Sequence, residues 1–225
     1  MADPAFSEGG YPAMDMQKVV SKRVVPVAVI EDAEHALPLA EALLAGGLGV
    51  IEVTLRTPAA EEALARIRKA HPDFILGAGT ILEPDQARRM AELGVDFGVS
   101  PGLRAEVVEA AHAAGLAFIP GVATATEIEA ALALDCRVLK FFPASLLGGV
   151  PMIEALAAPY RHREVRFVPL GGVNQATMGE YLACKDVAAI GGSWLVTRDL
   201  LDAGNWKEIT RRVADAVAAA VASDR

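Results

Sequence analysis

The sequence predicts one domain of the α/β class, a (β/α)8 TIM barrel, and three observations support this prediction. Eight short apolar segments alternate with eight segments of helical pattern within 225 residues. The apolar segments contain few polar residues, as expected for parallel strands covered on both faces. No G-x-G-x-x-G sequence opens a helix, which disfavours the alternative, a doubly wound open sheet. We expect the barrel domain at residues 13–225, after a loosely held tail at residues 1–12.

Local sequence justifies each element of the predicted barrel. A short helix at residues 14–22 is expected to cap one end. The strands are rich in β-branched and aromatic residues, and glycine or proline marks the ends of several helices. The expected strands are residues 23–30, 50–55, 74–76, 97–99, 116–119, 137–143, 165–168 and 187–190. The helices after them are expected at 31–46, 58–70, 84–93, 103–115, 125–134, 150–158, from 174 onward, and 205–221. Glycine turns are expected at 77–80, 120–121, 169–172 and 191–193.

Composition disfavours several classes of partner. The formal net charge is −8 and the Lys and Arg residues are scattered, so we expect no nucleic-acid and no membrane partner. The two cysteines and four histidines lack the spacing of a metal site, so we expect no metal. The chain shows neither a signal peptide nor an apolar stretch of membrane length. These features predict a cytoplasmic protein.

One lysine lies within an apolar strand, in the segment Arg137-Val138-Leu139-Lys140-Phe141-Phe142-Pro143. Loss of hydration disfavours the ammonium form, and a neutral lysine amine is a nucleophile that forms imines with carbonyl compounds. The alternative interpretation is a lysine that reaches along apolar surface to water. Lys140 is therefore a candidate nucleophile, and the other polar residues near strand ends bear on this choice.

Further polar residues fall at the carboxyl ends of the predicted strands, where barrels carry their active sites. Glu52 and Arg56 alternate along the second strand and so share one face, and Thr80 follows the third strand. Glu52 is a candidate proton shuttle for chemistry at Lys140, and Arg56 a candidate ligand for a carboxylate. The alternatives are a structural Glu52–Lys140 ion pair inside the barrel and a surface position for Arg56.

Two glycine loops give a separate signal. Gly171-Gly172 follows the seventh predicted strand, and Gly191-Gly192-Ser193 follows the eighth. Many barrels bind phosphate between these two loops through backbone N–H groups. Tight turns alone would also explain each pair of glycines.

Eight segments in order resemble one family. They are Val24–Val27, Val50–Thr57, Gly77–Thr80, Ser100–Leu103, Pro120-Gly121, Lys140–Ala144, Gly171–Val173 and Gly191–Val196. From about residue 18 to the C-terminus, the chain resembles the 2-keto-3-deoxy-6-phosphogluconate (KDPG) and 4-hydroxy-2-oxoglutarate (KHG) aldolases. The resemblance implies a class I pyruvate aldolase with a (β/α)8 fold, a homotrimer that needs no metal or other cofactor. Its expected substrate is a phosphorylated 2-keto acid.

The resemblance also implies residue roles. Lys140 would form the Schiff base and Glu52 would act as general acid and base. Arg56 and Thr80 would bind the pyruvyl carboxylate, and Gly171, Gly172, Gly192 and Ser193 would line the phosphate end. Leu170 departs from the gluconate type, which commonly has Thr before the two glycines, whereas galactonate-type relatives have an apolar residue there. The sequence around Arg56 is of the gluconate type, so we expect a gluconate substrate with relaxed selectivity at C4.

Two other functions fit the fold. A sugar-phosphate epimerase or isomerase would abstract a proton without forming an imine, but suitably placed histidines or metal ligands are not evident. A non-catalytic barrel that binds a phosphate ligand would need less than the combination of Lys140, Glu52 and Arg56.

Overall fold

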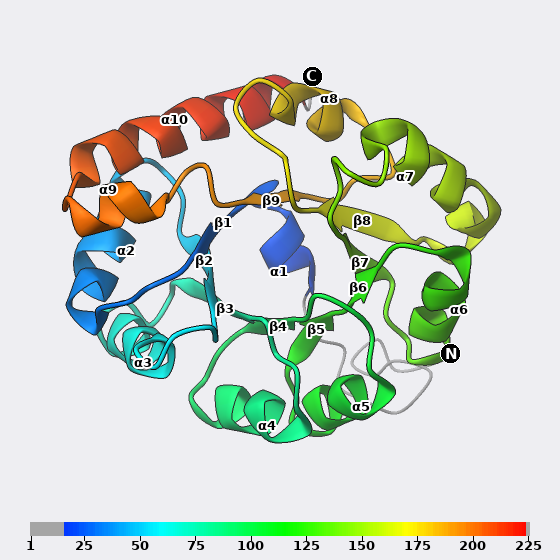
Figure 1. The fold of residues 1–225 in the computed structure, drawn as a ribbon, viewed down its shortest axis with the longest axis horizontal. Helices are drawn as coiled ribbons and strands as arrows, with labels where there is room; N and C mark the ends of the chain where they lie inside the picture. Colours follow the sequence, from blue (N-terminus) through cyan, green and yellow to red (C-terminus); the bar gives the residue numbers. More distant parts are fainter. Residues whose placement is uncertain (1–15, 224–225) are drawn as a thin grey trace.

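A computed structural model describes residues 16–223 as a ring of parallel strands surrounded by helices (Figure 1). The predicted tail at residues 1–12 lies outside the described residues, as does the start of the predicted first helix. The strands are β1 (Val24–Ala28), β2 (Val50–Thr54), β3 (Ile75–Gly79), β4 (Phe97–Val99), β5 (Ala117–Ile119), β6 (Gly121–Val122), β7 (Val138–Phe141), β8 (Arg166–Pro169) and β9 (Ile190–Gly192).

Helices follow the strands and cover the outside of the ring (Figure 1). The α-helices are α1 (Met16–Val20), α2 (Ala36–Ala45), α3 (Ala60–Ala70), α4 (Pro84–Glu92), α5 (Ala105–Ala113), α6 (Ala125–Ala133), α7 (Gly149–Ala157), α8 (Met178–Ala183), α9 (Arg198–Asp202) and α10 (Trp206–Ser223). Two 3-10 helices, η1 (Ala33–His35) and η2 (Ala158–Arg163), precede α2 and follow α7.

The strands pair in parallel and form two hydrogen-bonded sheets. One sheet has the order β5-β4-β3-β2-β1-β9 and the other has the order β6-β7-β8. β5 and β6 are consecutive in the chain and separated by Pro120, which has no N–H to donate. The Pro120 carbonyl accepts a hydrogen bond from Lys140 N at 2.9 Å, so this junction stays bonded to β7. The structure thus confirms an α/β fold with a curled parallel sheet.

The contact between β8 and β9 is sparser than the others. A single parallel bridge joins Phe167 to Val187, which precedes β9. Arginine side chains add to it: Arg23 Nη1 donates to the carbonyls of Val187 and Ala188, and Arg166 Nη2 also donates to Val187. We call this contact the β8–β9 seam. By contrast, β2 and β3 are aligned over five residue pairs.

The buried hydrophobic residues of the described chain fall into two clusters, and the main one includes residues from Val19 in α1 to Ala220 in α10. Helix α1 lies within the ring of strands in the view of Figure 1. Its Val20 packs with Val27 of β1, Val168 of β8 and Leu170, which follows β8. Because these side chains fill the interior, only a cavity of about 10 Å³ remains among them, about the size of one water molecule.

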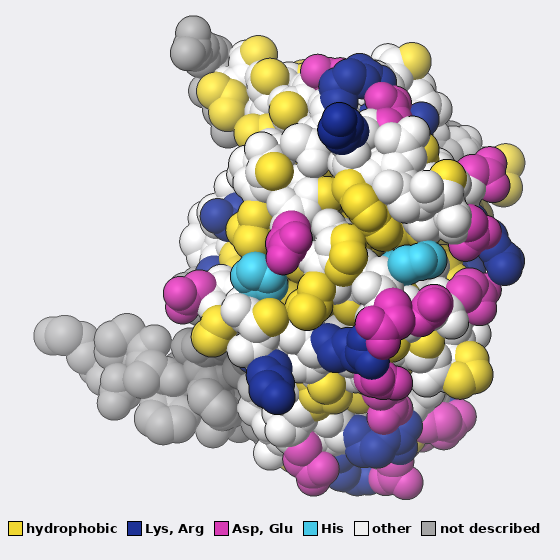
Figure 2. All heavy atoms as spheres, turned by 90° about the vertical axis from the view of Figure 1, so that its left-hand side faces the viewer, with side chains coloured by type: hydrophobic (Ala, Val, Ile, Leu, Met, Phe, Trp, Pro, Cys, Tyr) yellow, Lys and Arg dark blue, Asp and Glu magenta, His cyan; other side chains and the backbone are white. Residues whose placement is uncertain are grey.

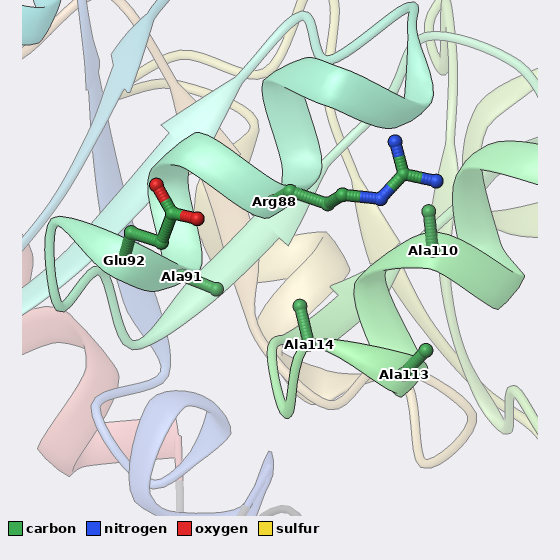
Figure 3. A pocket seen from close by; sticks show the side chains of 6 residues that line it. All are labelled: Arg88, Ala91, Glu92, Ala110, Ala113 and Ala114. Atoms are coloured by element: carbon green, nitrogen blue, oxygen red, sulfur yellow. The ribbon is translucent and has the colours of Figure 1, made fainter.

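The outer surface has two features of note. Figure 2 shows acidic and basic side chains interspersed on the face covered by α2, α3 and α9, so that this face carries no large area of one charge. Figure 3 shows a groove between α4 and α5, floored by Ala91, Ala110, Ala113 and Ala114 and rimmed by Arg88 and Glu92. Every helix within residues 16–223 is too short or too polar to span a bilayer.

Several predicted boundaries were wrong. The turn expected at residues 77–80 does not form, because β3 continues through Gly77 and Gly79. Gly121 likewise belongs to β6, and Gly191-Gly192 to β9. The helix expected from residue 174 begins at Met178, after a turn in which the Asn174 side chain accepts from Ala176 N at 2.9 Å. The short helix α9 was not predicted.

Candidate active site

Lys140 and Glu52 lie together inside the ring, on strands that are not neighbours. Each is the third residue of its strand, Glu52 in β2 and Lys140 in β7. Both line the small interior cavity, so both side chains project inward. Lys140 Nζ lies 4.0 Å from Glu52 Oε1, and the two residues are 7% and 3% exposed. The predicted meeting of these two residues is therefore present in the structure.

A missing side chain on β3 makes room for the carboxylate. A Cβ atom added to Gly79 would lie 2.1 Å from Glu52 Oε1, a distance that no van der Waals contact allows. On β3, Gly79 pairs with Thr54 of β2, and Thr54 is two residues after Glu52 in that strand. Glycine within a strand often marks such a close approach. Gly79 therefore determines where Glu52 can place its charge.

Burial dominates the electrostatics of Glu52. Loss of hydration raises the pKa of its carboxyl above the ordinary value of 4.5, and the positive charges of Lys140 and Arg56 oppose this rise only in part. The Lys140 amine also lies 5.0 Å from the centre of the Phe142 ring, within the range of a cation–π contact. The site can thus hold a carboxylic acid close to an amine, an arrangement suited to proton exchange.

Arg56 and Thr80 lie at the carboxyl ends of adjacent strands, β2 and β3. Arg56 is exposed, and its Nε donates to Thr54 Oγ1 at 3.1 Å. The surface position considered for Arg56 is thus correct as to exposure, but its charge still acts on Glu52. Thr80 is half-buried and adopts a left-handed backbone conformation with φ of 60°. Both residues lie at the end of the sheet where β2 and β3 terminate.

One glycine loop follows β8, and the other lies at the end of β9. Gly171 and Gly172 have φ of 85° and 88°, which glycine adopts without strain. Backbone bonds hold this loop to the loop after β7: Ala144 N donates to Leu170 O at 2.7 Å, and Ser145 N donates to Gly171 O at 2.9 Å. In the other loop, Gly192 is buried at the end of β9 and Ser193 is exposed.

Leu170 faces the interior rather than the solvent. It is buried and lines the same cavity as Lys140 and Glu52. A Cβ atom on Gly191 would lie 2.7 Å from Leu170 Cγ, so the leucine packs directly over that glycine. An apolar side chain therefore lies between the ends of β8 and β9. A threonine at this position would instead offer a hydroxyl for a hydrogen bond.

Sequence reasoning did not identify every residue near the site. Gly79 was assigned to a turn, although glycine in a strand pattern was the available signal. The sequence places Phe142 in the strand of Lys140, and no pattern in it indicates that the ring lies near the amine. Ser145 is not indicated by the sequence either, yet its Oγ lies so close to Gly172 that a Cβ atom on this glycine would be only 1.9 Å from it. Within residues 16–223 no group of three metal-binding side chains gathers.

The fold and the site define a class of protein: a parallel α/β ring with a buried lysine–carboxylate pair and glycine loops at neighbouring strand ends. The family model of KDPG and KHG aldolases matches residues 16–212, and the chain belongs to this family.

Individual relatives are similar over most of their length. The KHG/KDPG aldolase of Escherichia coli K12 is 45% identical over 194 residues, which are 86% of this chain and 90% of that protein. The KDPG aldolase of Zymomonas mobilis ZM4, solved with 3-phosphoglycerate, is 42% identical with a TM-score of 0.85, over 92% of this chain and 97% of that one. The Legionella pneumophila KDPG aldolase, solved with pyruvate as a covalent carbinolamine, is 42% identical with a TM-score of 0.82, over 85% and 92%.

Proposed function

We propose that this protein is a class I aldolase that cleaves 2-dehydro-3-deoxy-6-phosphogluconate to pyruvate and glyceraldehyde 3-phosphate. We include 4-hydroxy-2-oxoglutarate, cleaved to pyruvate and glyoxylate, as a second substrate. The observation that carries this proposal is the buried Lys140–Glu52 pair. The amine nitrogen and the carboxyl oxygen lie 4.0 Å apart, and burial raises the pKa of the carboxyl. Membership of the KDPG and KHG aldolase family supports it.

The first half of the reaction forms the imine. The neutral Lys140 amine adds to the C2 ketone, and the resulting carbinolamine loses water to give an iminium. Glu52 is close enough to transfer the protons that these steps require, directly or through one water. Arg56 and Thr80, at the ends of β2 and β3, bind the C1 carboxylate.

The second half breaks the carbon–carbon bond. Glu52 takes the proton of the C4 hydroxyl, the C3–C4 electron pair moves toward the iminium nitrogen, and the aldehyde leaves an enamine behind. Glu52 then returns a proton to C3, and water hydrolyses the imine to release pyruvate and Lys140. The phosphate of the aldehyde product lies against Gly171, Gly172, Gly192 and Ser193, where backbone N–H groups are the donors.

Reductive trapping tests the mechanism directly. Borohydride added with pyruvate should convert the imine to a stable secondary amine, and peptide mass mapping should locate the pyruvate-derived mass at Lys140. The matched control is Lys140→Arg, which keeps a positive charge but provides no amine of comparable nucleophilicity. A folded wild-type protein without an adduct would refute the imine mechanism and favour an epimerase or a phosphate-binding barrel.

Leu170 favours a second candidate, the 2-dehydro-3-deoxy-6-phosphogalactonate aldolase activity. The two substrates differ in configuration at C4, and Leu170 offers no hydrogen bond that would select one hydroxyl orientation. Comparing kcat/KM for the two phosphorylated substrates decides the preference. We expect the gluconate substrate to be preferred, and Leu170→Thr to increase that preference. An unchanged ratio in Leu170→Thr would show that this position does not read C4.

The wider organisation completes the proposal. Within residues 16–223, we propose that the ring closes as one (β/α)8 barrel with α1 as the cap of its interior, and the bonds at Pro120 and at the β8–β9 seam support this closure. The enzyme is a homotrimer of the cytoplasm. The exposed apolar side chains of Phe142, Leu146 and Met152 support the trimer as available contact area, and the buried free thiols of Cys136 and Cys184 suit a reducing compartment. Analytical ultracentrifugation would test the trimer.

A further inference from the structure

The loop that ends β9 is held from outside by a tryptophan. A Cβ atom on Gly192 would lie 1.9 Å from the six-membered ring of Trp194, so this ring lies directly against the Gly192 main chain. Within the described residues, the buried Trp194 Nε1 has no hydrogen-bond partner. The tryptophan therefore acts on the loop by packing and not through its indole N–H. Between them lies Ser193, whose carbonyl accepts a bond from Val196 N at 3.2 Å.

An arginine from the last helix holds the main chain of the same loop. Arg212 Nη1 donates to the Trp194 carbonyl at 2.8 Å, across 18 residues of sequence. Its Nε donates to Glu208 Oε1 at 2.9 Å, one turn earlier on α10. Hydrogen bonds from Arg211 and Arg212 lower the pKa of Glu208 to about 2, so Glu208 remains a carboxylate at neutral pH and keeps orienting Arg212.

Helix α10 is itself firmly placed against the body of the protein. Thr210 Oγ1 donates to the carbonyl of Ala42 in α2 at 3.0 Å, and Val213 is fully buried against Gly46. The position of Arg212 is thus set by packing on the far side of α10. A contact fixed in this way can restrict the orientation of the Gly192 and Ser193 N–H groups.

We propose that Arg212 is a positioning residue for the phosphate group of the substrate: it holds the Trp194 carbonyl, and with Trp194 it keeps the loop at Gly192 and Ser193 ready to bind phosphate. This inference rests on the proposed function, which places the phosphate at that loop. Arg212 itself does not contact the reacting atoms. Its effect should therefore appear in the binding of phosphorylated substrates and not in the chemical step.

Steady-state kinetics with two substrates tests the inference. Arg212→Ala should raise KM for 2-dehydro-3-deoxy-6-phosphogluconate about tenfold and change kcat by less than about twofold, because one charge-assisted hydrogen bond is lost. Kinetics with 4-hydroxy-2-oxoglutarate, which carries no phosphate, should change less than about twofold. Arg212→Lys should recover part of the loss. Equal losses with both substrates would overturn the inference, as would an unchanged KM for the phosphorylated one.

Three further variants sharpen the test. Arg211→Ala removes a neighbouring arginine that bonds Glu208 and Asp215 instead of the loop, so it should leave both substrates unaffected. Trp194→Phe should behave as wild type because an aromatic ring remains over Gly192, whereas Trp194→Ala should resemble Arg212→Ala. Melting temperatures of all variants identify any that fail to fold. If Arg211→Ala matched Arg212→Ala, the effect would belong to general helix charge and the inference would fail.

A binding measurement separates this inference from the proposed function. Calorimetric titration with glycerol 3-phosphate, which has no carbonyl group to react with Lys140, measures phosphate binding at the loop alone. Weaker binding to Arg212→Ala than to wild type supports the inference, and equal binding overturns it. A wild-type protein that forms no pyruvate adduct would instead refute the proposed function, whatever the outcome of this titration.

Discussion

Two carboxylates in this molecule are equally hidden from water but differently bonded. Glu52 is 3% exposed inside the ring, and Asp186 is 4% exposed beside the β8–β9 seam. Both oxygens of Asp186 accept hydrogen bonds from Arg161, at 3.1 Å from Nε and 2.8 Å from Nη2. Glu52 has the Lys140 amine at 4.0 Å, which is beyond hydrogen-bond distance.

The difference shows how burial can serve either structure or reactivity. A bidentate arginine compensates the charge of Asp186 and fixes its geometry, which suits a structural role. The charge of Glu52 is compensated only in part, so burial raises the pKa of its carboxyl. An incompletely paired carboxyl can bind and release a proton at little cost, which is what a general acid and base requires. The following predictions test this contrast.

The largest effect should come from Lys140. Lys140→Ala should lower kcat by about 10⁴-fold or more, since loss of a covalent nucleophile removes the reaction path itself. Arg161→Ala, which removes the partner of Asp186, should leave kcat within about twofold. Both are measured with an assay coupled to pyruvate formation. Substantial turnover in Lys140→Ala would mean that the amine is not the nucleophile.

Glu52→Gln should have the next largest effect. The amide cannot shuttle protons, so kcat should fall by about 10²- to 10⁴-fold. Because Gln fits the same space and requires no buried charge, the melting temperature should be equal to or above that of wild type. Thermal unfolding followed by circular dichroism checks this. An unfolded Glu52→Gln protein would instead indicate a structural ion pair like that of Asp186.

Asp186→Asn should give the opposite result, with stability lost and activity kept. The new amide N–H2 would face the donors of Arg161, so we expect the melting temperature to fall by about 3–8 °C and kcat to stay within about twofold. Asp215→Asn is the matched control, because its ion pair with Arg211 is exposed and should contribute little. A loss of kcat in folded Asp186→Asn would contradict the division of roles.

The smallest effect concerns stability as a function of pH. The pKa of Glu52 is higher in the folded than in the unfolded protein, so between the two values the folded state binds more protons. Glu52 therefore contributes stability that is fully present below pH 4.5, its ordinary pKa, and is lost as the pH rises through the folded-state pKa. The free energy of unfolding, measured with urea over this pH range, should depend on pH with different slopes in the wild type and in Glu52→Gln. Parallel curves would show that Glu52 does not titrate as inferred.

Much of the fold follows from patterns that are local in sequence. The alternation of apolar strands with helices predicted the α/β class, and the period-two pattern within β2 is consistent with the inward side chain of Glu52, whereas Arg56 lies beyond the end of that strand. Lys140 was identified as the exception in an apolar run. These predictions succeeded because each depends on neighbours within a few residues.

What failed depends on contacts between distant segments. Gly79 was placed in a turn because glycine disfavours strands, but its role is to leave space for Glu52, 27 positions earlier. The orientation of Leu170 toward the interior could not be read from its apolar character alone, since both faces of these strands are buried. Nor could the sequence show that Arg161 and Asp186 form a pair, since only the fold brings them together.

The sparse bonding of the β8–β9 seam has a consequence for motion. Only one bridge joins these strands, so the amide of Ala188, which donates to Phe167 O, should exchange its hydrogen faster than amides between β2 and β3. The two glycine loops lie at the carboxyl ends of the loosely joined strands, whereas Glu52 lies on the firmly joined pair. A ligand that binds both loops would therefore hold β8 and β9 together and slow the exchange of the Ala188 amide. It would leave the exchange of amides between β2 and β3 unchanged.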